Sequence, residues 1–210
     1  MAVNDGTKRR GLLLGMLFPL FFMLGWADSW ESVQRESANI TSVSAAFSQK
    51  KVMQILSKPL VSKGHFYFQA PDSVRWEYTS PVRSILLMRK GDIKRYTLVD
   101  RGMVKDSGEA LESMRIVLQE ISRWTKGQFT GNDLFSATLK AGKERQIILT
   151  PKEKGISAMI LRIVITLSSE RPGVLKSVKI MEKEGDYTLF EFTDVRINEK
   201  IDEAMFREVG

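Results

Sequence analysis

The chain has 210 residues, enough for one domain with a substantial core, and 32 Lys and Arg against 25 Asp and Glu give a formal charge of +7. It contains no Cys and a single His, which excludes a disulfide scaffold, lipid attachment to a cysteine and a His/Cys metal cluster. The basic residues are spread along the chain rather than gathered in a stripe, so we expect no nucleic-acid partner. Electrostatic attraction to anionic membrane surfaces stays open.

The first 27 residues have the pattern of a secretory signal peptide. A basic stretch at residues 8–10 precedes an almost wholly apolar run at residues 11–24, and small residues stand three and one positions before a cut after Ala27. The alternative is an uncleaved membrane anchor. The run is shorter than the roughly 20 residues that a spanning helix needs, and Pro19 lies inside it. We therefore expect an exported protein whose single folded domain is residues 28–210.

The first half of this domain reads as one short helix followed by a β-meander. Trp30, Val33, Ser37 and Ile40 recur at helical spacing, which predicts an amphipathic helix over 28–40. The strands that follow are expected at residues 43–52, 60–69, 73–79, 83–89 and 93–99.

The segment from Gly64 to Pro81 is the most informative of these. Its second strand alternates strictly, which places Val74, Trp76 and Tyr78 on one side of a sheet. Turn residues at 70–73 separate this strand from an aromatic first strand. The aromatic surface is open to two interpretations, an ordinary core or an apolar binding surface.

An amphipathic helix is predicted between Asp106 and Lys126. Its apolar stripe recurs at i, i+3, i+7 and i+10 and consists of Leu111, Met114, Leu118 and Ile121. Asp106 with Glu109 resembles a capping box, and Gly127 is a natural C-terminal stop. The helix either packs permanently on the sheet or acts as a movable lid, and the sequence does not distinguish the two.

Strands then resume at residues 135–140, 145–150, 159–167, 175–183 and 187–195, with turn residues between them. Regular spacing of this kind favours an antiparallel sheet or barrel. The predicted fold is therefore a single α+β domain.

Catalysis has little support. His65 is the only histidine, no nucleophile-elbow motif is present, and Glu182 and Glu184 lie in a highly charged hairpin typical of a solvated turn. We expect neither an enzyme nor a bound metal or cofactor, and a lipid-modifying enzyme is a weak alternative.

The arrangement resembles the LolA-type periplasmic lipoprotein carriers across roughly the whole domain. The matching residues are Phe47, Gln49, Gly64, Phe66, Phe68, Pro71, Arg75, Trp76, Glu77, Tyr78, Pro81, Gly91, Asp92, Tyr96, Leu149, Thr150 and Pro151. The resemblance implies a curved, incomplete antiparallel β-barrel closed by a lid of α-helices.

The resemblance also implies a function. The cavity of such a barrel would receive the acyl chains of lipoproteins, carried through the periplasm from an inner-membrane donor complex to an outer-membrane acceptor, and we expect a monomer. The expected residues of the cavity and lid are Phe47, Phe66, Phe68, Val74, Trp76, Tyr78, Leu87, Leu111, Met114, Leu118 and Ile121.

Two features depart from the family pattern. Ala70 stands where well-studied members carry a basic residue that ties barrel to lid, and Arg75 need not replace that residue because it points to the other pleat from Trp76. A C-terminal extension found in some carriers is expected to be absent after Phe206. These departures keep a second hypothesis open, an envelope lipid-binding accessory or sensor protein of an export complex with non-lipoprotein cargo.

Overall fold

The computed structural model describes residues 29–106, 119–182, 185–207 and 209. Eleven strands form one antiparallel sheet in the order β6-β5-β4-β3-β2-β1-β11-β10-β9-β8-β7. The strands are β1 Ser42–Val52, β2 Leu60–Gln69, β3 Ser73–Ser80, β4 Ser84–Arg89, β5 Asp92–Val99, β6 Gly102–Lys105, β7 Phe135–Lys140, β8 Gln146–Pro151, β9 Ile160–Leu167, β10 Leu175–Glu182 and β11 Tyr187–Ile197. The helical elements are α1 Trp30–Ser37, α3 Lys154–Ser157 and the 3₁₀ turn η2 Glu203–Phe206, and residues 119–125 are also helical.

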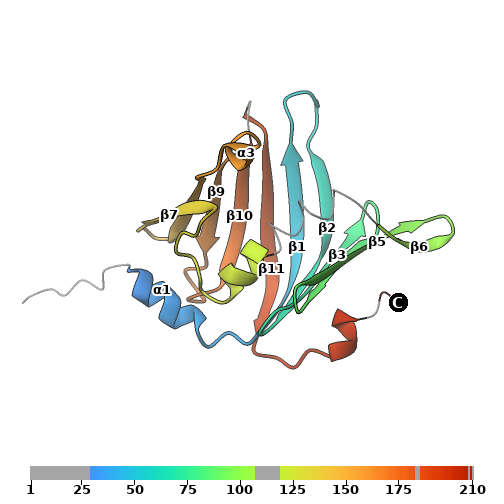
Figure 1. Cartoon of the computed structure of the whole chain (residues 1–210), viewed down its shortest axis with the longest axis horizontal. Helices are drawn as coiled ribbons and strands as arrows, with labels where there is room; N and C mark the ends of the chain where they lie inside the picture. Colours follow the sequence, from blue (N-terminus) through green and yellow to red (C-terminus); the bar gives the residue numbers. More distant parts are fainter. Residues whose placement is uncertain (1–28, 107–118, 183–184, 208, 210) are drawn as a thin grey trace, which may run out of the picture.

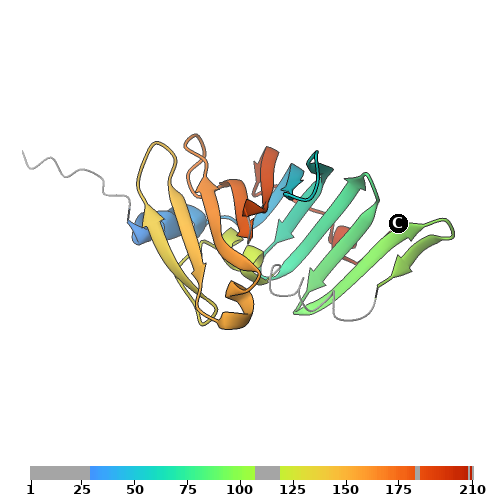
Figure 2. The ribbon, with the colours of Figure 1, turned by 90° about the horizontal axis from the view of Figure 1, so that it is seen from above.

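The sheet is curved and open, with β6 and β7 at its two free edges (Figures 1 and 2). Each half is a meander of neighbouring strands, and the two halves join where β1 pairs with β11 in the middle of the sheet. Within the described residues, this seam is the one pairing between strands that are not consecutive in the sequence. The predicted fold class, an incomplete antiparallel barrel with helices, is confirmed.

Period-two alternation gives the sheet one strongly apolar face, which is concave. Its buried residues include Phe66 and Phe68 from β2, Val74 from β3, and Ile163 and Ile165 from β9. Val33 of α1 joins the same cluster, as do Ile121, Trp124 and Phe129 from the second helical segment and the loop after it. Helix α1 and the second helical segment therefore lie on the concave side of the sheet and complete its core.

Helix α1 is fixed at both ends. Ser29 caps it, because its Oγ accepts the Ser32 N–H at 3.2 Å, and the Ser32 side chain accepts the Ser29 N–H in return. At the other end the buried Ser37 hydroxyl donates to the Gly173 carbonyl at 3.3 Å, and Glu36 forms an ion pair with Arg145. These contacts hold α1 against the β8–β10 half of the sheet.

The second helical segment ends in a Schellman motif at Gly127. The Gly127 N–H donates to the Trp124 carbonyl at 3.0 Å, and the Gln128 N–H donates to the Arg123 carbonyl at 2.9 Å. Gly127 has a φ of +73°, and a Cβ there would lie 2.5 Å from Cβ of Ser37. The predicted stop at Gly127 is confirmed, and the residue also allows close approach to α1.

The convex face carries a buried ion pair that holds the C-terminal segment. Arg75 donates through Nε to Glu77 Oε2 at 2.9 Å and through a terminal nitrogen to the Met205 carbonyl at 3.0 Å. Glu77 also accepts from Arg83 Nε at 3.1 Å, and Phe206 of η2 is buried nearby. Residues 75–78 therefore contribute to both faces of the sheet. Trp76 and Tyr78 pack on the concave face, and Arg75 and Glu77 hold the C-terminal segment on the convex face.

We expect Glu77→Ala to lower the free energy of unfolding by about 2–3 kcal/mol, because the buried Arg75 loses its carboxylate. Urea unfolding measures the change. The double variant Arg75→Met, Glu77→Met is the control, since replacing a whole buried pair by apolar side chains is often neutral. If the double variant is as unstable as Glu77→Ala, the loss of stability does not come from leaving Arg75 buried without its carboxylate.

Three short elements were not predicted. They are β6, α3 and η2, and each spans four residues. A segment this short contains at most one turn of helix or two strand periods, so its hydrophobic pattern carries little signal.

Candidate functional site

Six aromatic side chains form a continuous cluster on the concave face, centred on Trp76. Its ring centroid lies 4.8 Å from that of Phe47 and 5.3 Å from those of Phe66 and Phe190. Phe192 and Tyr78 lie at 6.2 and 6.4 Å. Most of the pairs are edge-on or tilted, the geometry that aromatic rings prefer. Trp76 is only 4% exposed, so it is the hub of the cluster.

A hydrogen bond at the rim of this cluster joins Tyr78 and Gln49, two of the residues that match the family pattern. The Tyr78 hydroxyl donates to Gln49 Oε1 at 2.6 Å, across strands that are not neighbours. Burial raises the pKa of Tyr78 to about 12. The phenol therefore stays neutral, and with the Gln49 amide it gives a largely apolar surface a fixed polar pair.

Gly64 makes room for Phe47 on the neighbouring strand. The two residues are register partners, and a Cβ on Gly64 would lie 2.7 Å from Cζ of the Phe47 ring. On its other side the same Cβ would lie 1.9 Å from the carbonyl oxygen of Glu77. The ring occupies the space that a side chain at residue 64 would need, and the sheet can curve tightly there.

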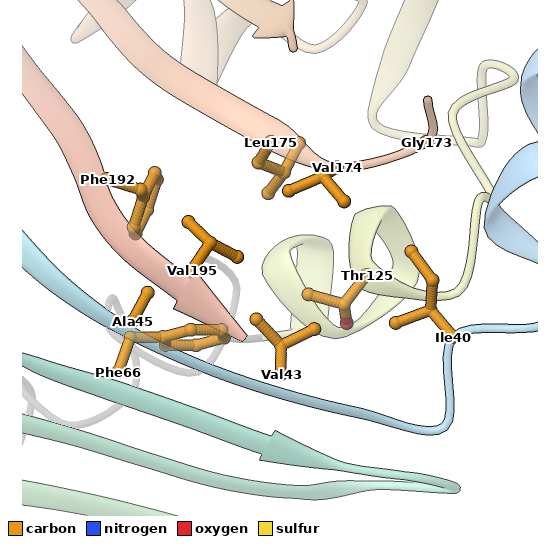
Figure 3. Close-up of a pocket in the computed structure, with 10 residues that line it drawn as sticks. All are labelled: Ile40, Val43, Ala45, Phe66, Thr125, Gly173, Val174, Leu175, Phe192 and Val195. Atoms are coloured by element: carbon orange, nitrogen blue, oxygen red, sulfur yellow. The ribbon is translucent and has the colours of Figure 1, made fainter. Parts of the chain in front are cut away.

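Side chains from the helical segment cover the concave face. Ile121 is 8% exposed, and Trp124 and Phe129 are still more deeply buried in the apolar cluster. An apolar cavity of about 30 Å³ remains between the described residues (Figure 3). It is lined by Ile40, Val43, Ala45, Phe66, Thr125, Gly173, Val174, Leu175, Phe192 and Val195. A cavity of this size has room for a water molecule or two but not for an acyl chain.

The structure brings most of the predicted site residues together. Phe47, Phe66, Phe68, Val74, Trp76 and Ile121 are buried in the concave cluster, and Tyr78 packs against it partly buried. Leu111, Met114 and Leu118 lie outside the described residues. Whether these side chains touch a ligand stays a prediction.

The expectation that Leu87 lines the cavity is wrong. Leu87 pairs with Arg75 in the β3–β4 register, whereas Leu86 pairs with Trp76. Leu87 therefore lies on the convex face, where it lines a hollow together with Phe206. Strand β4 is buried on both faces, so its continuous apolar run gave no alternation from which to choose.

Sequence reasoning also missed Phe190 and Phe192, which β11 places against Phe47 and Trp76. Their period-two spacing in β11 was a signal for a shared face. Nothing in the sequence indicated that β11 would pair with β1, which brings them into the cluster.

Ala70, the position that departs from the family pattern, is exposed. It lines a polar hollow between the end of β2 and the C-terminal residues 198–203. Its backbone N–H donates to the Thr41 carbonyl at 2.8 Å. The residue therefore borders the C-terminal segment.

The helical cover contains a buried carboxylate. Glu120 is 6% exposed, its Oε1 accepts from Asn132 at 2.6 Å, and Arg123 Nε lies 3.9 Å away. Burial raises the pKa of Glu120, and Arg123 and the hydrogen bonds from Asn132 and Trp124 partly oppose the shift. Folding therefore favours the protonated form, so the contribution of this group to stability is complete at acidic pH and declines as the pH rises through the raised pKa.

We expect Glu120→Gln to raise the urea midpoint at pH 7 and to leave it nearly unchanged at pH 4, where the carboxyl is largely protonated. The exposed Glu153→Gln is the matched control and should change neither midpoint. An equal effect of Glu120→Gln at both pH values would refute the role assigned to burial.

The described residues offer little for other chemistry. His65 is exposed on β2, with its ring beside that of Tyr67. Within residues 29–106, 119–182, 185–207 and 209, no group of three metal-ligating side chains is close enough to hold an ion. In the same part of the chain, no helix has both the length and the apolar character to cross a bilayer.

The fold and site define a class of protein, an open half-barrel whose apolar, aromatic interior is covered by helices. The chain belongs to the family described as outer membrane lipoprotein carrier protein LolA, whose model matches residues 38–208. The predicted resemblance is thus confirmed. An outer-membrane lipoprotein carrier protein from Pseudoalteromonas translucida (strain TAC 125) is 24% identical over 205 residues, which are 95% of this chain and 91% of the relative.

Solved structures with a similar trace share little sequence with the chain. A DUF1329 family protein from Desulfovibrio piger is 13% identical, with a TM-score of 0.45 over 84% of this chain and 95% of its own. A LolA superfamily protein from Nitrosomonas europaea is 8% identical, with a TM-score of 0.41 over 85% of this chain and 98% of its own.

Proposed function

We propose that this protein is a periplasmic carrier that shields the acyl chains of lipoproteins and moves them from a donor complex in the inner membrane to an acceptor at the outer membrane. The observation that carries the proposal is the aromatic concave face around Trp76, covered by a helical segment instead of a second sheet. Membership of the lipoprotein carrier family supports it. The relative from Pseudoalteromonas translucida bears the name of such a carrier.

The concave face suits an acyl ligand because it is apolar over many strands. Each methylene group moved from water into such a site contributes about 0.8 kcal/mol. Selectivity then needs little more than shape and length, which matches a largely apolar site with few fixed polar groups, the Tyr78 hydroxyl among them.

Cargo entry requires the cover to move. A cavity of about 30 Å³ cannot hold an acyl chain, and Trp124 and Phe129 occupy the space above the sheet. In this closed state the cover protects the apolar face from water. An incoming chain would replace the contacts of Ile121, Trp124 and Phe129 with equivalent apolar contacts, so exchange costs little net burial.

Two measurements test the proposal. Native mass spectrometry of protein purified from the periplasm should detect a bound acylated species. A transfer assay should then show labelled lipoprotein moving from donor to acceptor membranes only when the protein is present. Binding without transfer would favour the envelope accessory or sensor protein, and absence of any acylated ligand would refute both hypotheses.

A variant of the cover sharpens this test. We expect Ile121→Asp to reduce retention of an acyl probe, because the charge cannot be buried in the closed state. Ser136→Asp, on the exposed outer side of β7, is the matched control and should bind as the wild type does. If a folded Ile121→Asp variant retains the probe as well as the wild type does, the helical cover has no part in holding the ligand.

We also propose that residues 1–27 are removed during export and that the processed protein is a monomer in the periplasm. The mass of the protein recovered from the periplasmic fraction tests the cleavage after Ala27, and light scattering tests the monomer. An intact N-terminus recovered with the membrane fraction would instead support an anchor.

A further inference from the structure

Exposed apolar residues gather at one end of the sheet. Among the described residues, ten of the eleven large hydrophobic side chains that are exposed lie in or next to the loops at that end. They are Ile55, Leu56, Leu60, Val61, Val82, Leu98, Val99, Val104, Met159 and Leu161. We call this the hairpin end.

The strand order places these residues together. Neighbouring strands alternate in direction, so β1, β3, β5, β8 and β10 all run toward the hairpin end, and the loops that follow them lie there. Figure 1 shows the β1–β2 hairpin projecting beyond the other strands, with α3 at the same end. The remaining exposed hydrophobic residue, Ile197, ends β11 and lies at the opposite end of the sheet.

The β1–β2 hairpin is the most prominent part of this end. Ile55 is 89% exposed at its tip, and Leu60 and Val61 are about half exposed where β2 begins. The hairpin is tied to the neighbouring β10–β11 loop, because the Gln54 N–H donates to Asp186 Oδ1 at 2.8 Å. Burial in the described fold does not account for these apolar side chains, which lie at one end of the sheet rather than spread over the whole surface.

Basic side chains lie between the apolar ones. Lys50, Lys58, Lys63, Arg101, Lys152 and Lys154 are exposed at this end. The acidic residues described there are fewer, namely Asp100, Asp133, Glu153, Asp186 and a Glu182 already paired with Lys51 at 3.5 Å. The hairpin end is therefore both apolar and positively charged.

We propose that the hairpin end docks on the surface of an anionic lipid bilayer, with Ile55 and Leu56 among the headgroups and the lysines beside lipid phosphates. Amphipathic surfaces with this composition bind membrane interfaces through apolar insertion and attraction to anionic lipids. The apolar residues stand on separate loops along a rim, so they present scattered tips rather than a groove or one flat patch. A deformable bilayer surface accommodates such tips better than a rigid protein partner does.

Vesicle co-sedimentation tests the proposal. The protein should bind vesicles of phosphatidylglycerol and phosphatidylcholine at low salt at least about tenfold more tightly than vesicles of phosphatidylcholine alone. The variant Ile55→Asp, Leu56→Asp should weaken that binding by about tenfold or more. The variant Lys50→Glu, Lys58→Glu should remove most of the preference for the anionic lipid.

Ile197→Asp is the control, since it places an aspartate on an exposed apolar position at the opposite end. It should bind vesicles as the wild type does. Every variant carries the same N-terminus, so any contribution from the N-terminal segment cancels. Binding of an acyl probe without vesicles should be unchanged in the hairpin variant, which separates this proposal from the proposed carrier function.

Three results would overturn the docking proposal. The first is no difference between the two vesicle types, and the second is equal vesicle binding by the hairpin variant and Ile197→Asp. The third is self-association that the hairpin variant abolishes while vesicle binding persists, which would make the hairpin end a contact between two copies of the chain.

Discussion

Trp76→Ala is expected to lower the free energy of unfolding by about 3–5 kcal/mol and to abolish binding of an acyl probe. Trp76 is 4% exposed and has five aromatic rings around it, from four strands of both halves of the sheet. Removing the indole leaves a cavity that backbone ladders on either side prevent from collapsing. Urea unfolding and probe fluorescence measure the two effects.

Trp76→Phe is the control for this prediction. It keeps a ring at the centre of the cluster, so we expect a smaller loss of stability and measurable probe binding. If Trp76→Ala proves folded and binds the probe as tightly as the wild type, the aromatic cluster is a core without a ligand role.

Gly64→Ala is expected to cost more than about 3 kcal/mol or to prevent folding, although it adds a single methyl group. The new Cβ would lie 1.9 Å from the Glu77 carbonyl oxygen and 2.7 Å from the Phe47 ring. The oxygen belongs to the backbone of a central strand and cannot move without breaking the β2–β3 ladder. Yield and thermal unfolding of the purified variant measure the effect.

Gly142→Ala is the matched control, because its Cβ would meet only the Glu144 carbonyl oxygen, at 3.6 Å. We expect that variant to be as stable as the wild type. If Gly64→Ala is equally harmless, the sheet is more pliable at β2–β3 than its geometry indicates, and the close packing of Phe47 is not essential.

Much of the sheet could be predicted from the sequence, because most strands here carry a local signal. Residues 60–69 and 135–140 form strands with the predicted bounds, and the alternation of Val74, Trp76 and Tyr78 placed all three on the concave face. Hairpin turns such as Lys90–Gly91 could be read directly, since a positive φ at Gly91 suits a tight turn.

The central seam could not be predicted, and neither could the parts of the site that depend on it. β1 comes first and β11 last among the strands in the sequence, and their pairing brings Phe190 and Phe192 into the cluster. Leu87 was assigned to the wrong face because every residue but one of β4 is buried. The strand therefore shows no alternation of apolar and polar residues from which the direction of the Leu87 side chain could be inferred. Arg75 gave no sign of its partner, since the Met205 carbonyl lies 130 residues away.

The segment between β6 and β7 contributes no strand within its described part, residues 119–134. The ladder from β6 to β7 closes through the β1–β11 seam, so no strand register depends on this segment. The strands alone therefore set the register of the sheet, whereas Ile121, Trp124 and Phe129 of this segment decide how much of its concave face meets water.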